Sequence, residues 1–347
     1  LQSDPSSHIS ESEYAEGWRL SCASRPAGDV TVLVPDIASA YQSRMKTADL
    51  STGEEVALFG RLQADIQAAG VAFGNDFVQV WLELDEPTLD DTMPDNERLM
   101  RAAQAAFDGC TEVKLSYFVL KKLARTLREA DFKVQLSGTL TDGVLTIMDI
   151  TAQKDAPVYG CAIDIGTTTV TGLLMNLADG TLAAKASAGN GQIRYGADVI
   201  NRIVEQTKPG GVKKLQDAIL KETLLPLVAA MCKSAGITTS RILRVCIASN
   251  TTMNHLLLGV DANPVRMEPY IPSFFHLSGL TAKDLGFPAN PEAELLIAPN
   301  IGSYVGGDIT AGAFASLIWD KDEFSLFIDL GTNGELVFGN RDFMMSC

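Results

Sequence analysis

The feature that most constrains this chain is an apolar strand that ends in aspartate and enters a turn of glycine and hydroxyl residues. The sequence Ala-Ile-Asp-Ile-Gly-Thr-Thr-Thr-Val occupies positions 162–170. Small residues, free N–H groups and hydroxyls in such a hairpin can surround phosphate oxygens, and a carboxylate at the strand end can organise a hydrated Mg²⁺. Taken alone, the motif is equally compatible with an ordinary hairpin turn.

The same construction recurs at positions 327–336 as Phe-Ile-Asp-Leu-Gly-Thr-Asn-Gly-Glu-Leu. Two independent occurrences by chance are improbable, so the repeat favours a pair of loops that clamp a nucleoside triphosphate. Because each Asp ends a strand and each Thr lies in the following turn, we expect the two turns to face one cleft. The predicted nucleotide-binding residues are Asp164, Gly166, Thr167, Thr168, Thr169, Asp329, Gly331, Thr332, Asn333 and Gly334.

Two further loops lie between these motifs. A buried strand runs into Asn250 and Thr251, which could cap the next helix, and Gly306-Gly307-Asp308 opens another helix. The N–H groups at a helix N-terminus favour an anion, so both loops are candidates for the cleft. Both are also compatible with plain strand-to-helix connections.

From position 158 onward the chain alternates apolar strands with amphipathic helices. Strands are predicted at 161–164, 170–177, 243–249, 295–298, 326–329 and 335–338, and helices at 198–205, 212–235, 251–258 and 308–319. The two Asp-Gly-Thr loops resemble the phosphate-1 and phosphate-2 motifs of the actin, sugar kinase and heat-shock ATPase superfamily. This resemblance implies an α/β, ribonuclease-H-like domain over 156–347 with nucleotide in its cleft. The domain is expected to be incomplete at its C-terminus, because the superfamily's adenosine motif is missing.

An α+β middle domain is predicted over 76–153. A strand at 78–84 is followed by a helix at 97–107 and by a second helix that Ser116 could cap. The strands 134–140 and 144–150 are joined at Asp142-Gly143, a dipeptide suited to tight hairpin turns. Residues 36–75 are predicted to be a linker carrying one helix at 54–69.

Residues 1–35 have the pattern of the last part of a small β-rich module. Apolar residues alternate with polar ones from Trp18 to Val34, which predicts short strands around a turn at Gly28-Asp29. The chain starts with Leu1 and stops at Cys347 directly after a strand-like stretch, so we expect a fragment cut at both ends.

Composition excludes several classes of function. Lys+Arg total 28 against 43 Asp+Glu, and the resulting net charge of -15 disfavours nucleic acid and anionic membranes as partners. No apolar run approaches the roughly 20 residues of a membrane span, and no signal peptide is evident. Six cysteines without CxxC spacing argue for reduced thiols. A cytoplasmic protein is expected.

A narrower resemblance covers nearly the whole chain. The segments Pro-Thr-Leu-Asp-Asp at 87–91, Glu-Arg-Leu at 97–99, the turn at 164–169, Tyr-Gly-Ala-Asp-Val-Ile at 195–200 and the turn at 329–335 follow one another as in the reductive activators of corrinoid proteins. That family joins a [2Fe-2S] ferredoxin, a linker, a middle domain and an ATPase-like domain. The resemblance implies ATP-dependent return of Co(II) corrinoid to Co(I). The implied partners are a corrinoid protein of a methyltransferase system and an upstream electron donor, and the implied cofactors are a [2Fe-2S] cluster, ATP and Mg²⁺.

The resemblance also assigns a role to one cysteine. Gly-Trp-Arg-Leu-Ser-Cys at 17–22 is similar to the segment around the fourth cluster ligand of a β-grasp ferredoxin, which makes 1–35 the C-terminal part of that module and Cys22 its ligand. A [2Fe-2S] cluster needs four protein ligands, and the other three are expected upstream of Leu1. The remaining cysteines, His255 and His276 have no ligand-spaced partners and are interpreted as structural.

Two alternatives remain open. The chain could be an ATPase-type activator of another low-potential enzyme, such as those of 2-hydroxyacyl-CoA dehydratases, whose ligand cysteines lie within the ATPase domain. Here Cys232 and Cys246 have no supporting feature. The chain could also be a binding module for which nucleotide is only a conformational ligand. A protein that docks a corrinoid carrier needs a loop or groove close to its nucleotide domain, and we expect the segment 194–202 to lie near the cleft and to respond to Mg-ATP.

Overall fold

The chain divides into two units, Leu1–Ala40 and Tyr41–Cys347. The structure, a computed structural model, describes residues 2–3, 11–19, 24–25, 27–33, 46–47, 53–73 and 76–347. Cys22 therefore lies outside the described residues, together with Leu20 and Val34 of the predicted strands. Its role as a cluster ligand stays a prediction.

The first unit pairs β1 (Gln2–Ser3) with β2 (Ser24–Arg25) in antiparallel fashion, and α1 spans Glu11–Ala15. The predicted strand after Gly28-Asp29 is wrong for the part that is described, since residues 30–33 form no strand. Val30 and Val32 are exposed there. Alternation produces a strand only when a neighbouring strand pairs with the backbone, and the described residues supply none at this position.

The predicted α+β domain is built on a four-stranded sheet of order β4-β6-β7-β5. Its elements are β4 (Phe77–Glu83), α4 (Asp95–Ala106), β5 (Glu112–Leu115), α5 (Tyr117–Glu129), β6 (Lys133–Thr141) and β7 (Val144–Thr151). Asp142 and Gly143 both have positive φ, as the hairpin prediction requires. Ser116 caps α5, its Oγ accepting from Val119 N at 3.2 Å. Leu99, Leu123 and Leu136 lie in the buried core of this domain.

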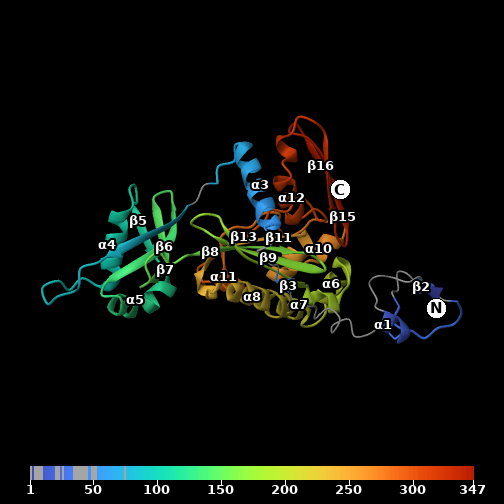
Figure 1. The fold of residues 1–347 in the computed structure, drawn as a ribbon, viewed down its shortest axis with the longest axis horizontal. Helices are drawn as coiled ribbons and strands as arrows, with labels where there is room; N and C mark the ends of the chain where they lie inside the picture. The colour runs from blue at the N-terminus through green and yellow to red at the C-terminus, as the bar shows by residue number, and fades with distance from the viewer. Residues whose placement is uncertain are drawn as a thin grey trace. The chain divides into compact units, whose positions relative to one another are not determined.

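A seven-stranded mixed sheet of order β12-β13-β11-β8-β9-β10-β3 forms the centre of the larger domain (Figure 1). β8, β9 and β10 are a consecutive antiparallel meander, whereas β11 is parallel to β8 and β13 is parallel to β11. The strands are β3 (Lys46–Thr47), β8 (Tyr159–Ile165), β9 (Thr169–Asn176), β10 (Leu182–Gly189), β11 (Ile242–Ser249), β12 (Leu280–Thr281) and β13 (Glu294–Ile297).

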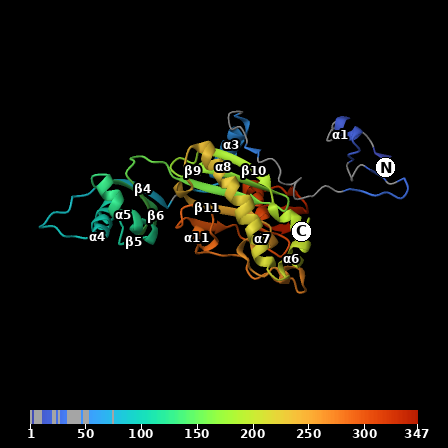
Figure 2. The same ribbon diagram turned by 90° about the horizontal axis from the view of Figure 1, so that it is seen from below.

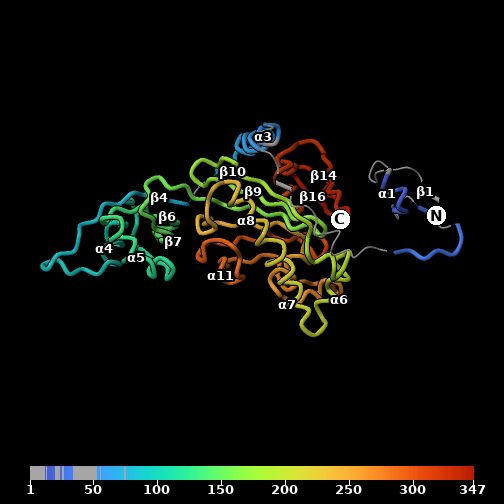
Figure 3. Tube along the Cα trace, turned by 60° about the horizontal axis from the view of Figure 1, so that its bottom comes forward, coloured from blue at the N-terminus to red at the C-terminus, as the bar shows by residue number. Residues whose placement is uncertain are grey.

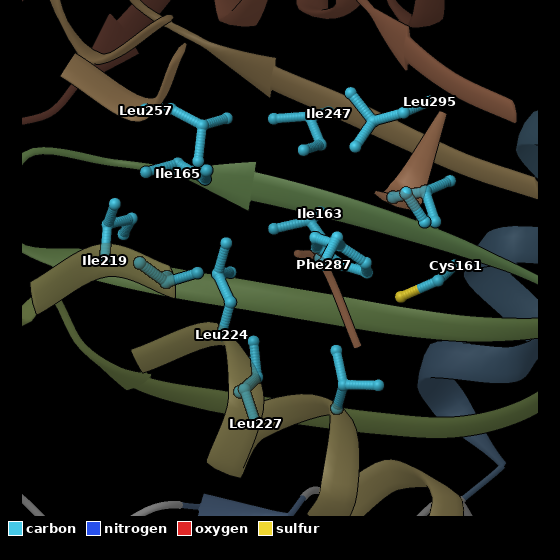
Figure 4. Packing of buried hydrophobic residues seen from close by; sticks show 14 of the residues in the cluster. Cys161, Ile163, Ile165, Ile219, Leu224, Leu227, Ile247, Leu257, Phe287 and Leu295 are labelled. Atoms are coloured by element: carbon cyan, nitrogen blue, oxygen red, sulfur yellow. The ribbon is translucent and has the colours of Figure 1, made fainter. Parts of the chain in front are cut away.

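Helices cover one face of this sheet, and Figure 2 shows α7 and α8 crossing in front of its strands. α7 (Gly211–Ile219), the π-helical turn η4 (Leu220–Leu224) and α8 (Leu225–Ala235) form one continuous segment that matches the predicted helix at 212–235. In Figure 4, Ile163 and Ile165 of β8 lie among Ile219, Leu224 and Leu227 of that segment. This apolar layer fixes the end of β8, and with it the position of Asp164.

Smaller helices complete this side of the domain. They are η3 (Gly191–Tyr195), α6 (Val199–Gln206), η5 (Thr239–Arg241), α9 (Thr251–Leu258), α10 (Asn263–Arg266) and α11 (Ala282–Leu285). α6 and α9 contact each other and α7, so these three helices are packed together. Within the described residues, no helix combines the length and the apolar character that crossing a membrane requires.

A second, three-stranded sheet follows at the end of the chain. It consists of β14 (Ser325–Leu330), β15 (Gly334–Gly339) and β16 (Met344–Ser346), and it packs against α12 (Gly307–Ala315) and η6 (Ile318–Asp320). Figures 1 and 3 show α3 (Glu54–Ala68) on the side of the large sheet away from α7 and α8. The helix predicted at 308–319 is shorter in the structure. It ends as α12 at Ala315, because Leu317 has a φ of 57°, which is outside the helical range.

Candidate functional site

The two Asp-x-Gly-Thr turns face one cavity of about 440 Å³. The first turn joins β8 to β9 and the second joins β14 to β15, so the two come from different sheets. The Thr168 and Thr332 hydroxyls are hydrogen-bonded to each other at 2.9 Å. Of the residues predicted from the sequence, the cavity is lined by Asp164, Gly166, Thr167, Thr168, Thr169, Asp329, Gly331, Thr332, Asn333, Asn250 and Asp308.

The first turn is held from behind by a buried asparagine. Asn190 has no exposed surface, and its Nδ2 donates to Gly166 O at 2.9 Å while its backbone N–H donates to Thr168 O at 2.8 Å. Gly166 N donates to Thr169 O across the turn, and a Cβ on Gly166 would lie 2.7 Å from that oxygen. Glycine is therefore needed at 166 for the tight closure. The Thr168 and Thr169 side chains are exposed to the cavity.

Four carboxylates surround the cavity: Asp164, Asp308, Asp329 and Glu335. The pKa of Asp164 is raised to about 6, chiefly by burial and in addition by the negative charges of Asp308 and Asp329. Burial also raises the pKa of Asp308 and of Glu335, with added repulsion from Asp329. The repulsion is consistent with the position of all four carboxylates on the wall of one cavity.

The carboxylates line the cavity without forming a closed metal cage. Among the described residues, no three His, Cys, Asp or Glu side chains are grouped closely enough to hold a metal directly. Mg²⁺ commonly keeps several waters and uses only one or two protein carboxylates, so this donor set fits a hydrated Mg²⁺ bound together with phosphate. The lining contains no Lys or Arg.

The loops between the motifs divide into lining and supporting residues. Asn250 caps α9, accepting from Met253 N at 2.8 Å, and its Nδ2 donates to Thr167 Oγ1 at 3.3 Å. Thr251 is not part of the cavity wall: it is buried and donates to Gly302 O at 2.6 Å. Thr251 therefore does not line the cavity, although the sequence made it a candidate for the cleft.

Gly306 and Gly307 are also supporting residues and do not line the cavity. A Cβ on Gly306 would lie 2.3 Å from Asn250 Cα, and one on Gly307 would lie 2.5 Å from Ala298 O. Gly334 lines a smaller neighbouring cavity of about 260 Å³, which shares Asn250, Asn333 and Glu335 with the first. The glycines at 306 and 307 allow two backbone segments to touch, a role that a glycine pattern alone does not distinguish from ligand contact.

Sequence reasoning missed residues that support the turns from a distance. Glu335 belongs to the second motif, but its place on the cavity wall follows from the β14–β15 pairing. Asn190 and Arg202 hold the first turn through backbone oxygens, and only the buried polar character of each could have drawn attention to them. The segment 194–202 does lie near the cleft, since Val199 and Ile200 line the smaller cavity.

The remaining thiols and His255 have ordinary structural surroundings. Burial raises the pKa of the Cys161 thiol to about 12, which keeps it protonated. His255 is fully buried, with its Nδ1 near Thr251 O and its Nε2 accepting from Ser273 N at 3.1 Å. These bonds explain the histidine without a ligand.

Two region models of one protein family match adjoining parts of this chain. The RACo linker region model matches residues 67–156, and the RACo middle region model matches residues 159–321. The corrinoid activation enzyme RamQ of Eubacterium limosum is 38% identical over 191 residues, which are 55% of this chain and 32% of that protein.

A solved structure matches over the full length of the chain. It is described as a reductive activator for corrinoid, iron-sulfur protein, has 32% sequence identity and a TM-score of 0.67, and is covered over 54% of its own chain. The present chain thus spans about a third of the curated relative and about half of the solved one. Two adjoining region models and a full-length structural match support the same conclusion, and the chain belongs to the RACo family.

Proposed function

We propose that the two turns bind the phosphates of a Mg-nucleoside triphosphate, ATP in the first place. The observation that carries the proposal is the convergence of two Asp-x-Gly-Thr turns from separate sheets on one cavity, where Thr168 and Thr332 meet at 2.9 Å. The antiparallel meander extended by two parallel strands supports the ribonuclease-H-like, ATPase-type interpretation of this domain. The hydroxyls and the turn N–H groups supply the donors that phosphate oxygens need.

Because the cavity is negatively charged, the ligand that we propose is ATP together with Mg²⁺ rather than free ATP. Four carboxylates and no basic side chain would repel free ATP. Bound Mg²⁺ would neutralise phosphate charge and polarise the terminal phosphoryl group. Asp164, Asp308, Asp329 and Glu335 would hold the waters of this ion, while the turn residues orient the phosphates.

At the level of the whole protein, we propose ATP-dependent reductive activation of a corrinoid protein in a methyltransferase system. A [2Fe-2S] cluster, held in part by Cys22 and reduced by an upstream donor, would supply the one electron that reduces Co(II) to Co(I), and nucleotide would offset the unfavourable potential. The family and the functions for which the two relatives are named support this proposal. Cys22 is proposed as the fourth cluster ligand in a cytoplasmic protein.

A second candidate function is supported by the same cavity. Enzymes that transfer phosphoryl groups usually place a cation or a metal on the developing charge, and here only a metal could serve, because the lining has no Lys or Arg. Nucleotide could therefore act as a conformational ligand that is not hydrolysed. Phosphate release measured with the chain at saturating Mg-ATP separates the two functions.

Calorimetry with the full chain tests the nucleotide proposal. We expect weak but measurable binding of Mg-ATP and none of ATP in excess EDTA. Equal heats with and without Mg²⁺, or no binding of Mg-ATP at all, would contradict the proposal.

The redox proposal has its own test. Because one thiolate cannot hold a [2Fe-2S] cluster, anaerobic reconstitution of this chain with iron and sulfide should leave no visible absorption. A stable cluster of one per chain would overturn the assignment of Cys22 as a single ligand. Visible spectra of a Co(II) corrinoid protein mixed with the chain, Mg-ATP and a chemical reductant should show faster formation of Co(I) than without nucleotide.

A further inference from the structure

Arg202, on α6, is a fully buried cation with no ion-pair partner among the described residues. Its guanidinium donates from Nε to Gly196 O at 2.9 Å and from Nη2 to Thr167 O at 2.5 Å, and Nη1 lies 3.2 Å from Met253 Sδ. The carboxylates nearest to Arg202 along the chain are engaged elsewhere, Asp198 with Asn201 and Glu205 with Lys208 and Lys214. A buried charge held only by carbonyl dipoles and a thioether is costly for folding.

The three partners of Arg202 belong to three parts of the site. Thr167 lies in the first turn, Met253 lies one helical turn after the cavity residue Asn250, and Gly196 precedes α6. The fit at Gly196 is close, since a Cβ there would lie 2.8 Å from Arg202 N. One side chain thus ties the turn to the start of α6 and to α9.

The bond to Thr167 O fixes the orientation of the peptide that follows it. In a trans peptide the C=O and the next N–H point in opposite directions, and the cis peptide recorded among the described residues is Glu268-Pro269. Because Thr167 O points toward buried Arg202, the Thr168 N–H points the other way, toward the cavity that Thr168 lines. No acceptor for this N–H lies within the described part of the chain.

We propose that Arg202 is a positioning residue that holds the Thr167–Thr168 peptide with its N–H facing the phosphate, and adds a buried positive charge behind that amide. The inference rests on the proposed nucleotide function and deepens it. The same side chain connects the phosphate to α6, whose residues Ile200 and Val204 are partly exposed. Nucleotide occupancy is thereby linked to the surface of α6.

The test compares Arg202→Met and Arg202→Lys with Arg194→Met as the matched control. Arg194 lies eight residues earlier, pairs with Glu222 and lines neither cavity. Calorimetry is performed with Mg-ATP and with Mg-tripolyphosphate, which lacks the nucleoside. We expect R202M to lose at least tenfold in affinity for both ligands and R194M to stay within about twofold. Lysine keeps the charge but cannot donate to Thr167 O and Gly196 O together, so R202K should lose less than R202M.

Each outcome decides between the two claims. If the unmodified chain binds neither ligand, the proposed function fails and the inference fails with it. If the unmodified chain binds and folded R202M binds equally well, the inference alone is overturned.

A measurement on the unmodified chain covers the case in which the variants do not fold. Hydrogen exchange of the Thr168 amide should slow on addition of Mg-tripolyphosphate, because the N–H gains an acceptor. Unchanged exchange in the presence of bound ligand would overturn the assignment.

Discussion

The residues at the cavity place several negative charges close together, which is unfavourable for the stability of the ligand-free chain. Asp164 ends β8, where apolar packing of Ile163 and Ile165 fixes the strand and leaves the carboxylate facing the cavity. Burial, with added repulsion from Asp308 and Asp329, raises the pKa of Asp164 to about 6. A site that destabilises its own anions gains most from a bound cation.

Asp164→Asn should weaken Mg-ATP binding by roughly tenfold or more, about 1.4 kcal/mol. The physical reason is the loss of the carboxylate that organises the hydrated metal, with the shape of the turn retained. Calorimetry measures the change. Asp179→Asn is the control, because Asp179 lies in the β9–β10 turn, away from the cavity, and its carboxylate accepts from Thr181 N and Thr181 Oγ1. Equal losses in both variants would contradict a specific role for Asp164.

The raised pKa of Asp164 predicts two opposite pH effects. Affinity for Mg-ATP should fall as the pH decreases through about 6, because the protonated acid no longer attracts the metal. In the ligand-free chain the native state holds this proton more tightly than the unfolded state, whose Asp has a pKa near ~3.9. The contribution of Asp164 to stability is therefore greatest at low pH and is lost as the pH rises through about 6.

It follows that Asp164→Asn should raise the melting temperature of the ligand-free chain at pH 7, by an amount that solvent screening keeps small because Asp164 is exposed to the cavity. The gain should shrink as the pH is lowered from about 6 toward ~4, where the native acid is already protonated. Differential scanning calorimetry at several pH values measures it. A gain that is constant with pH would argue that asparagine stabilises by packing rather than by removing charge.

At the scale of elements, the site depends on one close crossing of backbone. The loop before α12 passes over the junction of β11 and α9, where Gly306 approaches Ser249 and Asn250. Its φ of -97° is ordinary, so the glycine is required by space and not by conformation. The crossing brings Asp308 to the cavity beside Asn250.

Gly306→Ala should therefore destabilise the chain by about 1–3 kcal/mol, since the added methyl meets backbone that has no room to move. Urea denaturation measures the loss, and Mg-ATP affinity should decrease as well because Asn250 is displaced. Gly302→Ala is the matched control in the same loop, where a Cβ would meet nothing within 4 Å. Similar losses in both variants would contradict the steric argument.

The α+β domain joins the larger domain through charged groups. Asp149, 4% exposed, forms ion pairs with Lys122 of its own domain and with Arg241, which lies 2.8 Å away at the end of η5, directly before β11. Arg241 also donates to the carbonyls of Ala156 and Pro157. The region that the family model names a linker is thus a folded domain anchored at its last strand.

Arg241→Met should lower the free energy of unfolding by about 2–3 kcal/mol, because Asp149 loses a cation and two carbonyls lose a donor. Guanidinium or urea titration followed by circular dichroism measures the change. Arg125→Met is the control, since its exposed pair with Glu129 should contribute no more than about 0.5 kcal/mol. A loss no larger than that of the control would mean that the Asp149–Arg241 ion pair contributes little to stability.

At the scale of the molecule, the cavity and the apolar clusters of the described residues belong to the second unit. The cavity is lined by residues between Asp164 and Glu335, and the buried members of the four apolar clusters begin at Leu82. β3 nonetheless adds Lys46–Thr47 to the edge of the large sheet beside β10. We therefore expect the boundary that affects the stability of the larger domain to lie before β3.

Deletion of residues 1–40 should leave both the melting temperature and the affinity for Mg-ATP nearly unchanged. Deletion of residues 1–75 removes β3 and α3 as well, and it should lower the melting temperature because β10 becomes an uncovered edge. Thermal scans of the two shortened chains measure the difference. Equal stability of both would show that β3 contributes nothing to the sheet.

Local patterns predicted much of the structure, and the particular misses are informative. The Asp142-Gly143 hairpin, the Ser116 cap and the long helix from 212 to 235 were all predicted, because each depends on residues close together in the chain. β10 was missed because its sequence, Leu-Ala-Ala-Lys-Ala-Ser-Ala-Gly, has little intrinsic strand preference. Its strand state comes from pairing with β9.

The sequence by itself determined the two Asp-x-Gly-Thr turns, since strand, glycine and hydroxyls are adjacent and their chemistry is local. Only the tertiary structure decided which other groups join them. Asp308 and Glu335 reach the same cavity, and Arg202 lies behind the first turn, because strand order and helix packing bring together residues far apart in the chain. Burial in the folded chain then shifts the pKa values of these groups, and burial cannot be derived from the residues adjacent in the sequence.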